Sequence, residues 1–338
     1  MILRVPDYYD EFQCLAGECP HSCCEKWEVV LDGEHVSLYE HVPGLLGEKL
    51  RAAMCTDEEG DVCFSLKGGR CPFLNEENLC EIHKQLGEEA TSITCQEHPR
   101  FTEDYGPFRE ITLSASCPAA NALLLRSEAP LTFRDLETEE PGEEGDSWLE
   151  WLLPLRDRML GLLTDRALPL RVRLSYFLQL ALDAQTWMDE EADLPALVAE
   201  WRPGELEYMD GIPVFPDALR VLGQLETLES DWPKLLERAE EVEPQPVSET
   251  LLERIAAYFA FRYLLKAVND GDLLSRAQLV VLAVLVIQRL AAVCGLPEAL
   301  RRFSCEIEHS DENLSTLLEC FWTEEALSPG SLIRELGV

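Results

Sequence analysis

The 338-residue sequence is poor in basic side chains: 28 Lys and Arg stand against 64 Asp and Glu, for a formal net charge of −36. Proteins bind nucleic acids and anionic membrane surfaces through basic patches that neutralise phosphates. We therefore expect no nucleic-acid partner and no membrane partner. An acidic surface of this kind instead favours solubility and attraction to a basic partner.

Long apolar runs are also missing. The longest uninterrupted run, residues 279–287, has nine residues, whereas a membrane-spanning helix needs about 20. The N-terminus has no basic region followed by an apolar stretch, so we predict no secretory signal and a cytoplasmic protein. In a reducing cytosol, clustered cysteines indicate metal sites or reactive thiols rather than disulfides.

Two familiar cofactor signatures are absent from the sequence. No predicted strand leads into a G-x-G-x-x-G turn, so a Rossmann-type site finds no support. The C-x3-C-x2-C loop of radical enzymes does not occur either. The sequence therefore identifies neither a cofactor pocket nor a catalytic residue.

Cysteine, in contrast, is abundant and unevenly placed. Ten of the 13 cysteines fall within the first 117 residues. Eight of these form three blocks with short spacings: C-x4-C-x3-C-C, then C-P-F-L-x5-C-x2-H, then C-x2-H-P-R followed by S-C-P. The eight are Cys14, Cys19, Cys23, Cys24, Cys71, Cys80, Cys95 and Cys117.

Thiolates at such spacings are typical ligands of soft or borderline metals, and we predict that these eight bind metal. The irregular spacing and the Cys-Cys pair fit an iron–sulfur cluster better than a zinc site built from two C-x2-4-C pairs, with zinc as the alternative. Cys23 and Cys24 project differently, so both are not expected on one metal atom. Eight thiolates suffice for two four-cysteine sites, or for one site beside a second set of reactive or buried thiols.

The remaining cysteines and the two nearby histidines favour plainer roles. Free cysteine often packs as a small apolar side chain, and we expect this of Cys55, Cys63, Cys294, Cys305 and Cys320. His83 and His98 follow cysteines at ligand spacing. For both, hydrogen bonding beside the metal is the favoured interpretation over direct ligation.

The pattern predicts a mainly α protein in which a small Cys-rich metal-binding domain packs on a larger all-helical domain. We place the Cys-rich domain at residues 1–127, an acidic linker or loop at 128–147, and the helical domain at 148–338. The linker is inferred from its run of acidic residues with Pro and Gly.

Helical periodicity is clear in the second half of the sequence. A proline at position 154 should bend or end the first helix there. The most apolar segment predicts a central helix surrounded by the others. The expected helices start at about residue 148 and cover about 170–181, 249–266, 273–293 and, as the last one, 311–322.

A few polar residues of the helical region are candidates for catalysis. Glu306, Glu308 or His309 would serve as a base, but a charged face on an exposed helix or loop is the favoured interpretation. Arg262 and Tyr263 interrupt an apolar face. They would line a pocket, although a helix–helix seam is the commoner setting for such residues.

The cysteine blocks resemble those of the flagellin lysine-N-methylase family, and are also similar to a broader group of zinc- or iron-chelating Cys-cluster proteins. The resemblance is strongest in G-R-C-P-F-L-N-E-E-N-L-C-E-I-H and S-I-T-C-Q-E-H-P-R. His98 is a departure, since an aromatic residue is expected before Pro99. The segments that carry the resemblance are 14–24, 69–87, 92–100, 113–119, 251–265 and 303–310.

This resemblance implies an S-adenosylmethionine-dependent methyltransferase that modifies lysine side chains of a protein, with flagellin as the substrate. It also implies a [4Fe–4S] cluster on cysteines drawn from the eight. The alternative is a metal-binding, redox-sensing or maturation protein whose helical domain binds a partner without methyl transfer.

Overall fold

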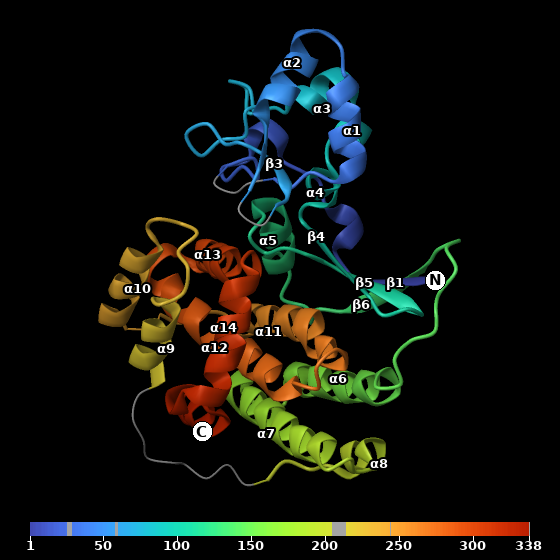
Figure 1. Cartoon of the computed structure of the whole chain (residues 1–338). Helices are drawn as coiled ribbons and strands as arrows, with labels where there is room; N and C mark the ends of the chain where they lie inside the picture. Colours follow the sequence, from blue (N-terminus) through green and yellow to red (C-terminus); the bar gives the residue numbers. More distant parts are fainter. Residues whose placement is uncertain (26–28, 58–59, 205–213, 244, 338) are drawn as a thin grey trace. The chain divides into compact units, whose positions relative to one another are not determined.

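The computed structural model describes the chain except for residues 26–28, 58–59, 205–213, 244 and 338 (Figure 1). The chain divides into two compact units. Unit 1 comprises Met1–Asp10, Thr102–Ser116 and Asn121–Val338, and unit 2 comprises Glu11–Phe101 and Cys117–Ala120. The first 127 residues are therefore shared between both units, and a Cys-rich domain with the boundaries 1–127 stays a prediction.

The mainly α class is confirmed. Every regular element described within residues 148–338 is helical. The sequence analysis did not locate the helices over Leu194–Glu200, Val214–Leu222, Trp232–Glu241 and Leu296–Glu308, and the last described helix is Pro329–Glu335 rather than the one at 311–322. The helices are α6 (Leu149–Thr164), α7 (Leu170–Asp189), α8 (Leu194–Glu200), α9 (Val214–Leu222), α10 (Trp232–Glu241), α11 (Glu249–Tyr263), α12 (Leu273–Cys294), α13 (Leu296–Glu308), α14 (Asp311–Thr323) and α15 (Pro329–Glu335).

Of the two effects predicted for Pro154, ending the helix is wrong, and a bend there stays a prediction. Helix α6 continues through it to Thr164. Proline removes the backbone hydrogen bond to the residue four positions earlier, here Glu150 in the exposed first turn. Buried leucines on both sides of Pro154, such as Leu152 and Leu155, anchor the helix against the core.

A small sheet forms part of unit 1, in the order β4-β5-β1-β6. Strand β1 (Ile2–Pro6) is parallel to β5 (Phe108–Leu113) and antiparallel to β6 (Phe133–Glu137), and β4 (Arg100–Asp104) borders β5. Strand β6 lies within the segment predicted to be a linker or loop. It is a strand because its backbone pairs with β1 along its whole length. Phe133 of this strand stacks on Phe261 of α11 at 3.8 Å between ring centroids.

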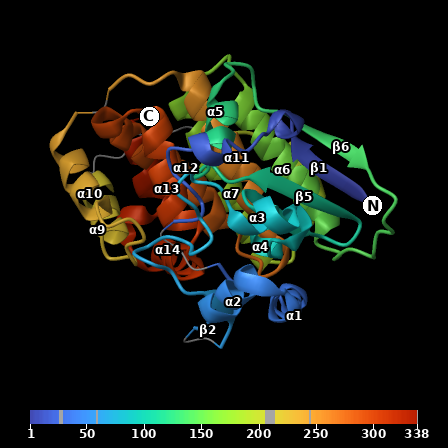
Figure 2. The same cartoon turned by 90° about the horizontal axis from the view of Figure 1, so that it is seen from above.

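Helix α12 is the core helix of unit 1, as predicted. It packs against α7, α10, α11 and α13, which surround it in Figures 1 and 2. Its length and composition alone would also suit a membrane span, and it is the one such helix among the described residues. Most of its side chains are buried inside unit 1, which is the setting of a core helix.

Helix α11 carries polar side chains into this core. Tyr258 and Tyr263 donate hydrogen bonds to the Glu308 carboxylate over 3.1 and 3.2 Å. The Nε of Arg262 lies 2.7 Å from the same carboxylate, and the Ser304 hydroxyl donates to it as well. The Glu308 side chain is fully buried, so its charge depends on these partners for compensation.

Unit 2 is built from short elements. They are α1 (Gly33–His41), α2 (Gly44–Ala53), the hairpin β2 (Met54–Thr56) and β3 (Val62–Phe64), α3 (Glu81–Leu86), α4 (Ile93–Glu97) and the start of α5 (Pro118–Leu125). Its core is a small apolar cluster in which Phe64 stacks on Tyr39 and contacts Phe73. Ile82 of α3 and Leu50 of α2 complete that cluster.

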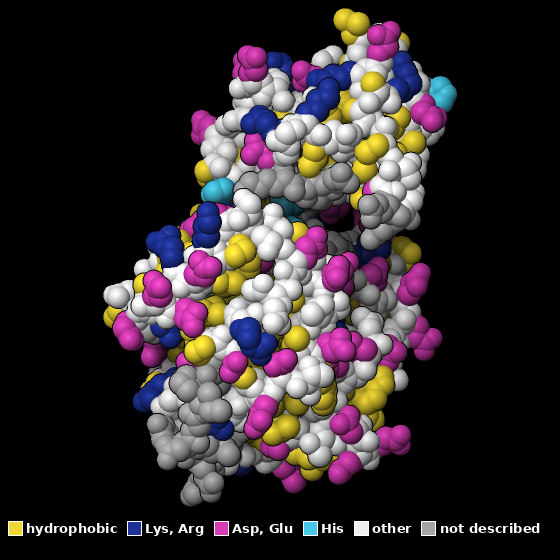
Figure 3. Space-filling view, turned by 60° about the vertical axis from the view of Figure 1, so that its left-hand side comes forward, with side chains coloured by type: hydrophobic (Ala, Val, Ile, Leu, Met, Phe, Trp, Pro, Cys, Tyr) yellow, Lys and Arg dark blue, Asp and Glu magenta, His cyan; other side chains and the backbone are white. Residues whose placement is uncertain are grey.

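On the face that Figure 3 shows, Asp and Glu side chains are scattered, with fewer Lys and Arg among them, rather than gathered in one patch. Such a distribution is typical of a solvated acidic surface and would attract a basic partner over long range.

We predict that Glu308→Gln destabilises the protein by about 3–5 kcal/mol, because it leaves the buried Arg262 charge without its carboxylate. Urea unfolding followed by circular dichroism measures this loss. Glu312→Gln, an exposed position on α14, is the matched control and should unfold like the wild type. Equal stability of the two variants would contradict the structural role of Glu308.

Candidate metal-binding region

All eight predicted metal-binding cysteines belong to unit 2, including Cys117, which is far from the others in the sequence. The structure describes every one of them, and none of them is in a disulfide. Among the described residues, no group of three or more His, Cys, Asp or Glu side chains is arranged to hold a single metal ion. The assignment of these eight cysteines as metal ligands therefore stays a prediction. The contacts around each sulfur show whether a metal could bind there.

The first block forms an irregular loop around the 3₁₀ helix Ala16–Glu18. The Ala16 N–H lies 3.3 Å from the Cys14 sulfur, and the Cys19 thiol lies 3.2 Å from the His21 carbonyl. The loop is joined to the second block through the backbone, since the Cys71 N–H donates to the Cys24 carbonyl over 2.8 Å.

The second block forms a turn fastened to the core of unit 2. Phe73 is fully buried. The Leu74 N–H donates to the Cys71 carbonyl, and Leu74 also pairs with Cys80 in an isolated antiparallel bridge. Cys80 is the N-cap residue of α3. Burial raises the pKa of its thiol, while the nearby N–H groups of His83 and Ile82 act to lower it. Free N–H groups at a helix start are favourable partners for a thiolate.

The third block places its two cysteines at helix starts too. Cys95 lies in α4, whose N-cap Ser92 accepts a hydrogen bond from the Cys95 N–H, and Thr94 binds the Val30 carbonyl over 2.9 Å. Cys117 directly precedes α5, and the N–H groups of Ala119 and Ala120 are directed at its sulfur.

The thiols are crowded enough to influence one another's ionisation. Burial, and then the neighbouring thiolates Cys24, Cys95 and Cys80, raise the pKa of Cys71 to about 12. Burial and the thiolates of Cys24 and Cys80 raise the pKa of Cys95 to about 11. In the adjacent pair, the thiol of Cys23 donates to Cys24, which lowers the pKa of Cys24 to about 7 and raises that of Cys23.

This donor set fits a thiolate-bound metal. Metal ligation requires deprotonated cysteines, and a bound cation removes the repulsion that otherwise keeps neighbouring thiols protonated. Backbone N–H groups directed at ligand sulfurs are a recurrent feature of such centres. The crowding, the N–H donors and the soft ligands suit an iron–sulfur cluster or zinc alike.

The cysteines outside the three blocks include one close pair. Cys55 and Cys63 face each other across the β2–β3 hairpin with 3.3 Å between their sulfurs. Cys63 is buried, in line with a packing role. Cys294, Cys305 and Cys320 lie half-buried on helices of unit 1.

One of the two histidines lies within a short helix of unit 2, and the other lies directly after one. His83 is exposed on α3, and its carbonyl accepts the Gly87 N–H that ends the helix. His98 follows α4 as its C-cap. A hydrogen-bonding role beside a metal stays a prediction for both.

The candidate bases of α13 are not on an exposed charged face, which corrects that prediction for two of them. Glu306 is buried and accepts the N–H groups of Leu228 and Glu229 over 2.9 and 2.7 Å. Glu308 is buried among its α11 partners. Both carboxylates serve to join helices. Arg262 and Tyr263 lie where α11 packs against α13, which confirms the prediction that they belong to a helix–helix contact.

His309, at the end of α13, keeps an exposed edge while its Nε2 meets two serine hydroxyls. Ser114 and Ser116 lie 2.9 and 2.8 Å from this nitrogen. Burial of the ring, followed by the charge of Arg262, lowers the pKa of His309 to about 4. The imidazole is therefore neutral near pH 7, a state that suits hydrogen bonding to hydroxyl groups.

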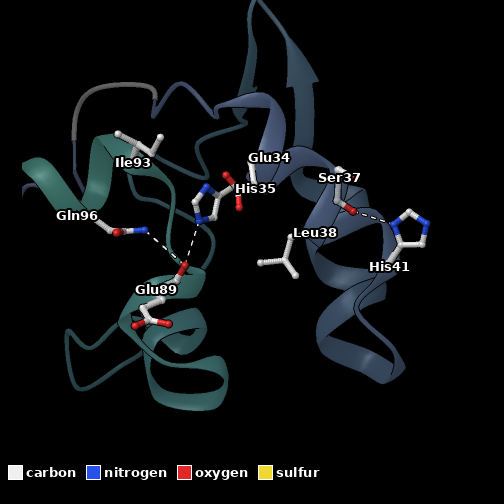
Figure 4. A pocket seen from close by; sticks show the side chains of 8 residues that line it. All are labelled: Glu34, His35, Ser37, Leu38, His41, Glu89, Ile93 and Gln96. Carbon is white, nitrogen blue, oxygen red and sulfur yellow. Dashed lines mark hydrogen bonds between the residues drawn. The ribbon is translucent and has the colours of Figure 1, made fainter. Parts of the chain in front are cut away.

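Sequence reasoning did not find an open hollow on unit 2, between α1 and the segment leading to α4 (Figure 4). Its volume is about 620 Å³, and its lining includes the carboxylates Glu34 and Glu89 and the apolar Leu38 and Ile93. Both apolar side chains are exposed. Such a lining offers carboxylates to an ammonium group and apolar contacts to an alkyl stem.

Asp32 supports one wall of this hollow. Its carboxylate caps α1 through the His35 N–H, accepts the His35 ring nitrogen at 2.8 Å, and accepts the Ile93 N–H of α4 over 3.0 Å. Burial opposes its ionisation, but the bonds from Ile93 and His35 outweigh that effect and lower the pKa of Asp32 to about 2. The D-x-x-H spacing at a helix start was the sequence signal for this cap.

Comparison with known proteins gives partial similarities. The chain is 28% identical over 132 residues to the lysine-N-methylase of Salmonella choleraesuis (strain SC-B67), covering 36% of this chain and 31% of that protein. It is 27% identical over 126 residues to the flagellar biosynthetic protein FliU of Salmonella muenchen, covering 36% of this chain and 75% of that protein. The chain thus spans about a third of the lysine-N-methylase it matches. No family model and no solved structure matches the chain.

We predict that Asp32→Ala loosens α1 and α4 together, because one carboxylate holds both helices. Loss of a cap costs roughly 1–2 kcal/mol, which should speed amide exchange in residues 33–41 and 93–97 about tenfold. Hydrogen–deuterium exchange with mass spectrometry measures this.

The same substitution has a pH signature. Because the folded-state pKa of Asp32 is lowered, its contribution is present above its ordinary pKa and disappears as the pH falls towards 2. The difference between variant and wild type should therefore shrink in acid. Glu40→Ala, exposed on the same helix, is the control, and equal exchange in both variants would refute the role of Asp32.

Proposed function

We propose that this chain transfers methyl groups from S-adenosylmethionine to lysine side chains of a protein, with flagellin as the substrate. The similarity to proteins named lysine-N-methylase and FliU carries the proposal. The eight clustered cysteines of unit 2 support it further, because they match the motifs through which the sequence resembles the flagellin lysine-N-methylase family.

Methyl transfer from S-adenosylmethionine to an amine does not require a nucleophilic side chain of the protein. Methyl transfer to an amine is a polar displacement in which the lysine nitrogen must be unprotonated and in line with the sulfonium carbon. The protein must therefore orient two substrates and keep the amine neutral at the moment of attack. The acidic surface of the chain suits the first approach of a lysine-bearing partner.

The cysteines are assigned to an iron–sulfur cluster, with zinc as the alternative. A bound metal would neutralise the crowded thiolates and order the loops that carry them. The N–H groups of Ile82 and His83, and those of Ala119 and Ala120, would stabilise the ligand sulfurs of Cys80 and Cys117.

The test is methyl transfer by the full chain purified without oxygen. Incubation with isotopically labelled S-adenosylmethionine and purified flagellin should place labelled methyl groups on lysine side chains, as read by mass spectrometry of flagellin peptides. Flagellin with acetylated lysines is the control substrate and should remain unlabelled, because acetylation removes the nucleophile.

We further expect Cys24→Ser to lower the rate by about tenfold or more, since even partners of metal ligands often contribute that much. Cys320→Ser, on α14 of unit 1, is the matched control and should retain the wild-type rate. A metal-loaded protein that neither binds S-adenosylmethionine nor labels flagellin would refute the proposal. That result would favour a redox-sensing or maturation role.

A further inference from the structure

The β2–β3 hairpin of unit 2 carries two cysteines that lie outside the three blocks. The two strands are antiparallel, and their register places Cys55 directly opposite Cys63. Side chains of directly opposite residues in such a pair extend to the same face of the sheet. The two sulfurs lie 3.3 Å apart, and neither cysteine is in a disulfide. The strand pairing itself therefore brings the two thiols together.

The backbone at this pair has the spacing that a disulfide needs. The Ser65 N–H donates to the Ala53 carbonyl over 2.8 Å, and the Asp57 N–H donates to the Asp61 carbonyl over 3.0 Å. These bonds lie two positions from the cysteines on either side, and hydrogen-bonded pairs recur at every second position of an antiparallel ladder. The cysteines thus form a hydrogen-bonded pair, for which the Cα atoms are about 5.5 Å apart, within the commonest range for disulfides.

Strand β3 is held along both edges, which fixes the backbone position of Cys63. Besides its pairing with β2, the Leu31 N–H donates to the Val62 carbonyl over 2.8 Å, and the Phe64 N–H donates to the Val29 carbonyl over 3.2 Å. Phe64 belongs to the apolar core of unit 2. Because successive side chains of a strand point to opposite faces, the two cysteines lie on the other face of the hairpin, and a bond between them leaves this core in place.

The two thiols differ in their access to solvent. Cys63 is fully buried, whereas Cys55 is half-buried. A reagent from solution therefore reaches Cys55 first. Cys63 is then the thiol that lies next to the modified sulfur. A reachable thiol beside a second thiol is the arrangement in which a mixed disulfide is resolved into an internal one.

We propose that Cys55 and Cys63 form a reversible dithiol–disulfide site that exchanges with low-molecular-weight disulfides. The Cys55 thiolate attacks one sulfur of the reagent, and the other half leaves as a thiolate that takes up the proton lost by Cys55. The Cys63 thiolate then attacks the Cys55 sulfur and releases the second half in the same way. Two protein thiols are oxidised to one disulfide, and the reagent disulfide is reduced to two thiols.

The strand pairing favours the internal disulfide over the mixed one. The sulfurs must approach by only about 1.3 Å from their 3.3 Å separation to reach the length of a disulfide bond. A thiol held at this distance attacks as if present at a very high concentration, because its position is already fixed by the fold. The exchange requires neither bound metal nor methyl transfer, so it goes beyond the proposed function and does not depend on it.

Equilibration of the full chain with glutathione tests the site in a single peptide. The protein is purified without oxygen and incubated with mixtures of reduced and oxidised glutathione, and the remaining thiols are alkylated before digestion with trypsin. Cleavage after Arg51 and Lys67 releases a peptide that contains these two cysteines and no others. We expect this peptide to lose two hydrogen atoms in oxidising mixtures, as read by mass spectrometry, and dithiothreitol should restore both thiols.

A second cleavage identifies the bond. A protease that cuts at Asp61 separates the two cysteines of the peptide, and the parts should stay joined only while the disulfide is present. The internal disulfide should exceed the glutathione adduct by about tenfold or more. A wild-type peptide that carries only glutathione, or that remains alkylated at both cysteines in every mixture, would overturn the proposal.

Substitutions test the order of the two steps. We expect Cys63→Ser to accumulate the glutathione adduct on Cys55, because the resolving thiol is gone. Cys55→Ser should leave Cys63 as an unmodified thiol, because burial blocks the reagent. Cys320→Ser, on α14 of unit 1, is the matched control and should form the internal disulfide like the wild type. An unmodified Cys55 in folded Cys63→Ser protein would refute Cys55 as the entry point. Circular dichroism checks folding, and the wild-type measurement stands without the variants.

Discussion

Burial of clustered thiols is the constraint on which unit 2 depends. Burial, and then the charges of neighbouring cysteines, raise the pKa values of Cys71 and Cys95, so these thiols keep their protons well above the ordinary range. A unit with a small apolar core has little other energy to offset such crowding. The crowding becomes favourable once a cation binds, since it then supplies preassembled ligands.

Unit 1, in contrast, contains buried carboxylates, and side chains of the protein itself compensate their charge. Glu308 is matched by Arg262 and two tyrosines, and on the sheet side Glu110 forms a two-pronged pair with Arg156 at 2.5 and 2.6 Å. Each pair joins elements that are distant in the sequence. Removing one partner leaves the other buried and uncompensated, so these pairs fix which helices and strands can pack together.

The sequence predicted features that depend on local spacing. The apolar run of α12 and the extent of α7 from residue 170 follow from periodicity, and the cysteine blocks from short spacings. Burial of Glu308 was not predictable in this way, because its partner Arg262 is 46 residues away and only packing brings them together. Strand β6 was not predicted for the same reason, because its partner β1 (Ile2–Pro6) is far away in the sequence.

The contacts between cysteine blocks are not predictable from spacing. The Cys24 carbonyl accepts the Cys71 N–H over 2.8 Å, so the fold joins the first block to the second across 46 intervening residues. A metal bound by cysteines of different blocks would cross-link segments that are distant in the sequence, and such a cross-link removes entropy from the unfolded chain. Under the proposed function, metal binding and folding of unit 2 would therefore be coupled. Loss of activity in a cysteine variant consequently reports on the fold as much as on chemistry, and metal content must be measured beside it.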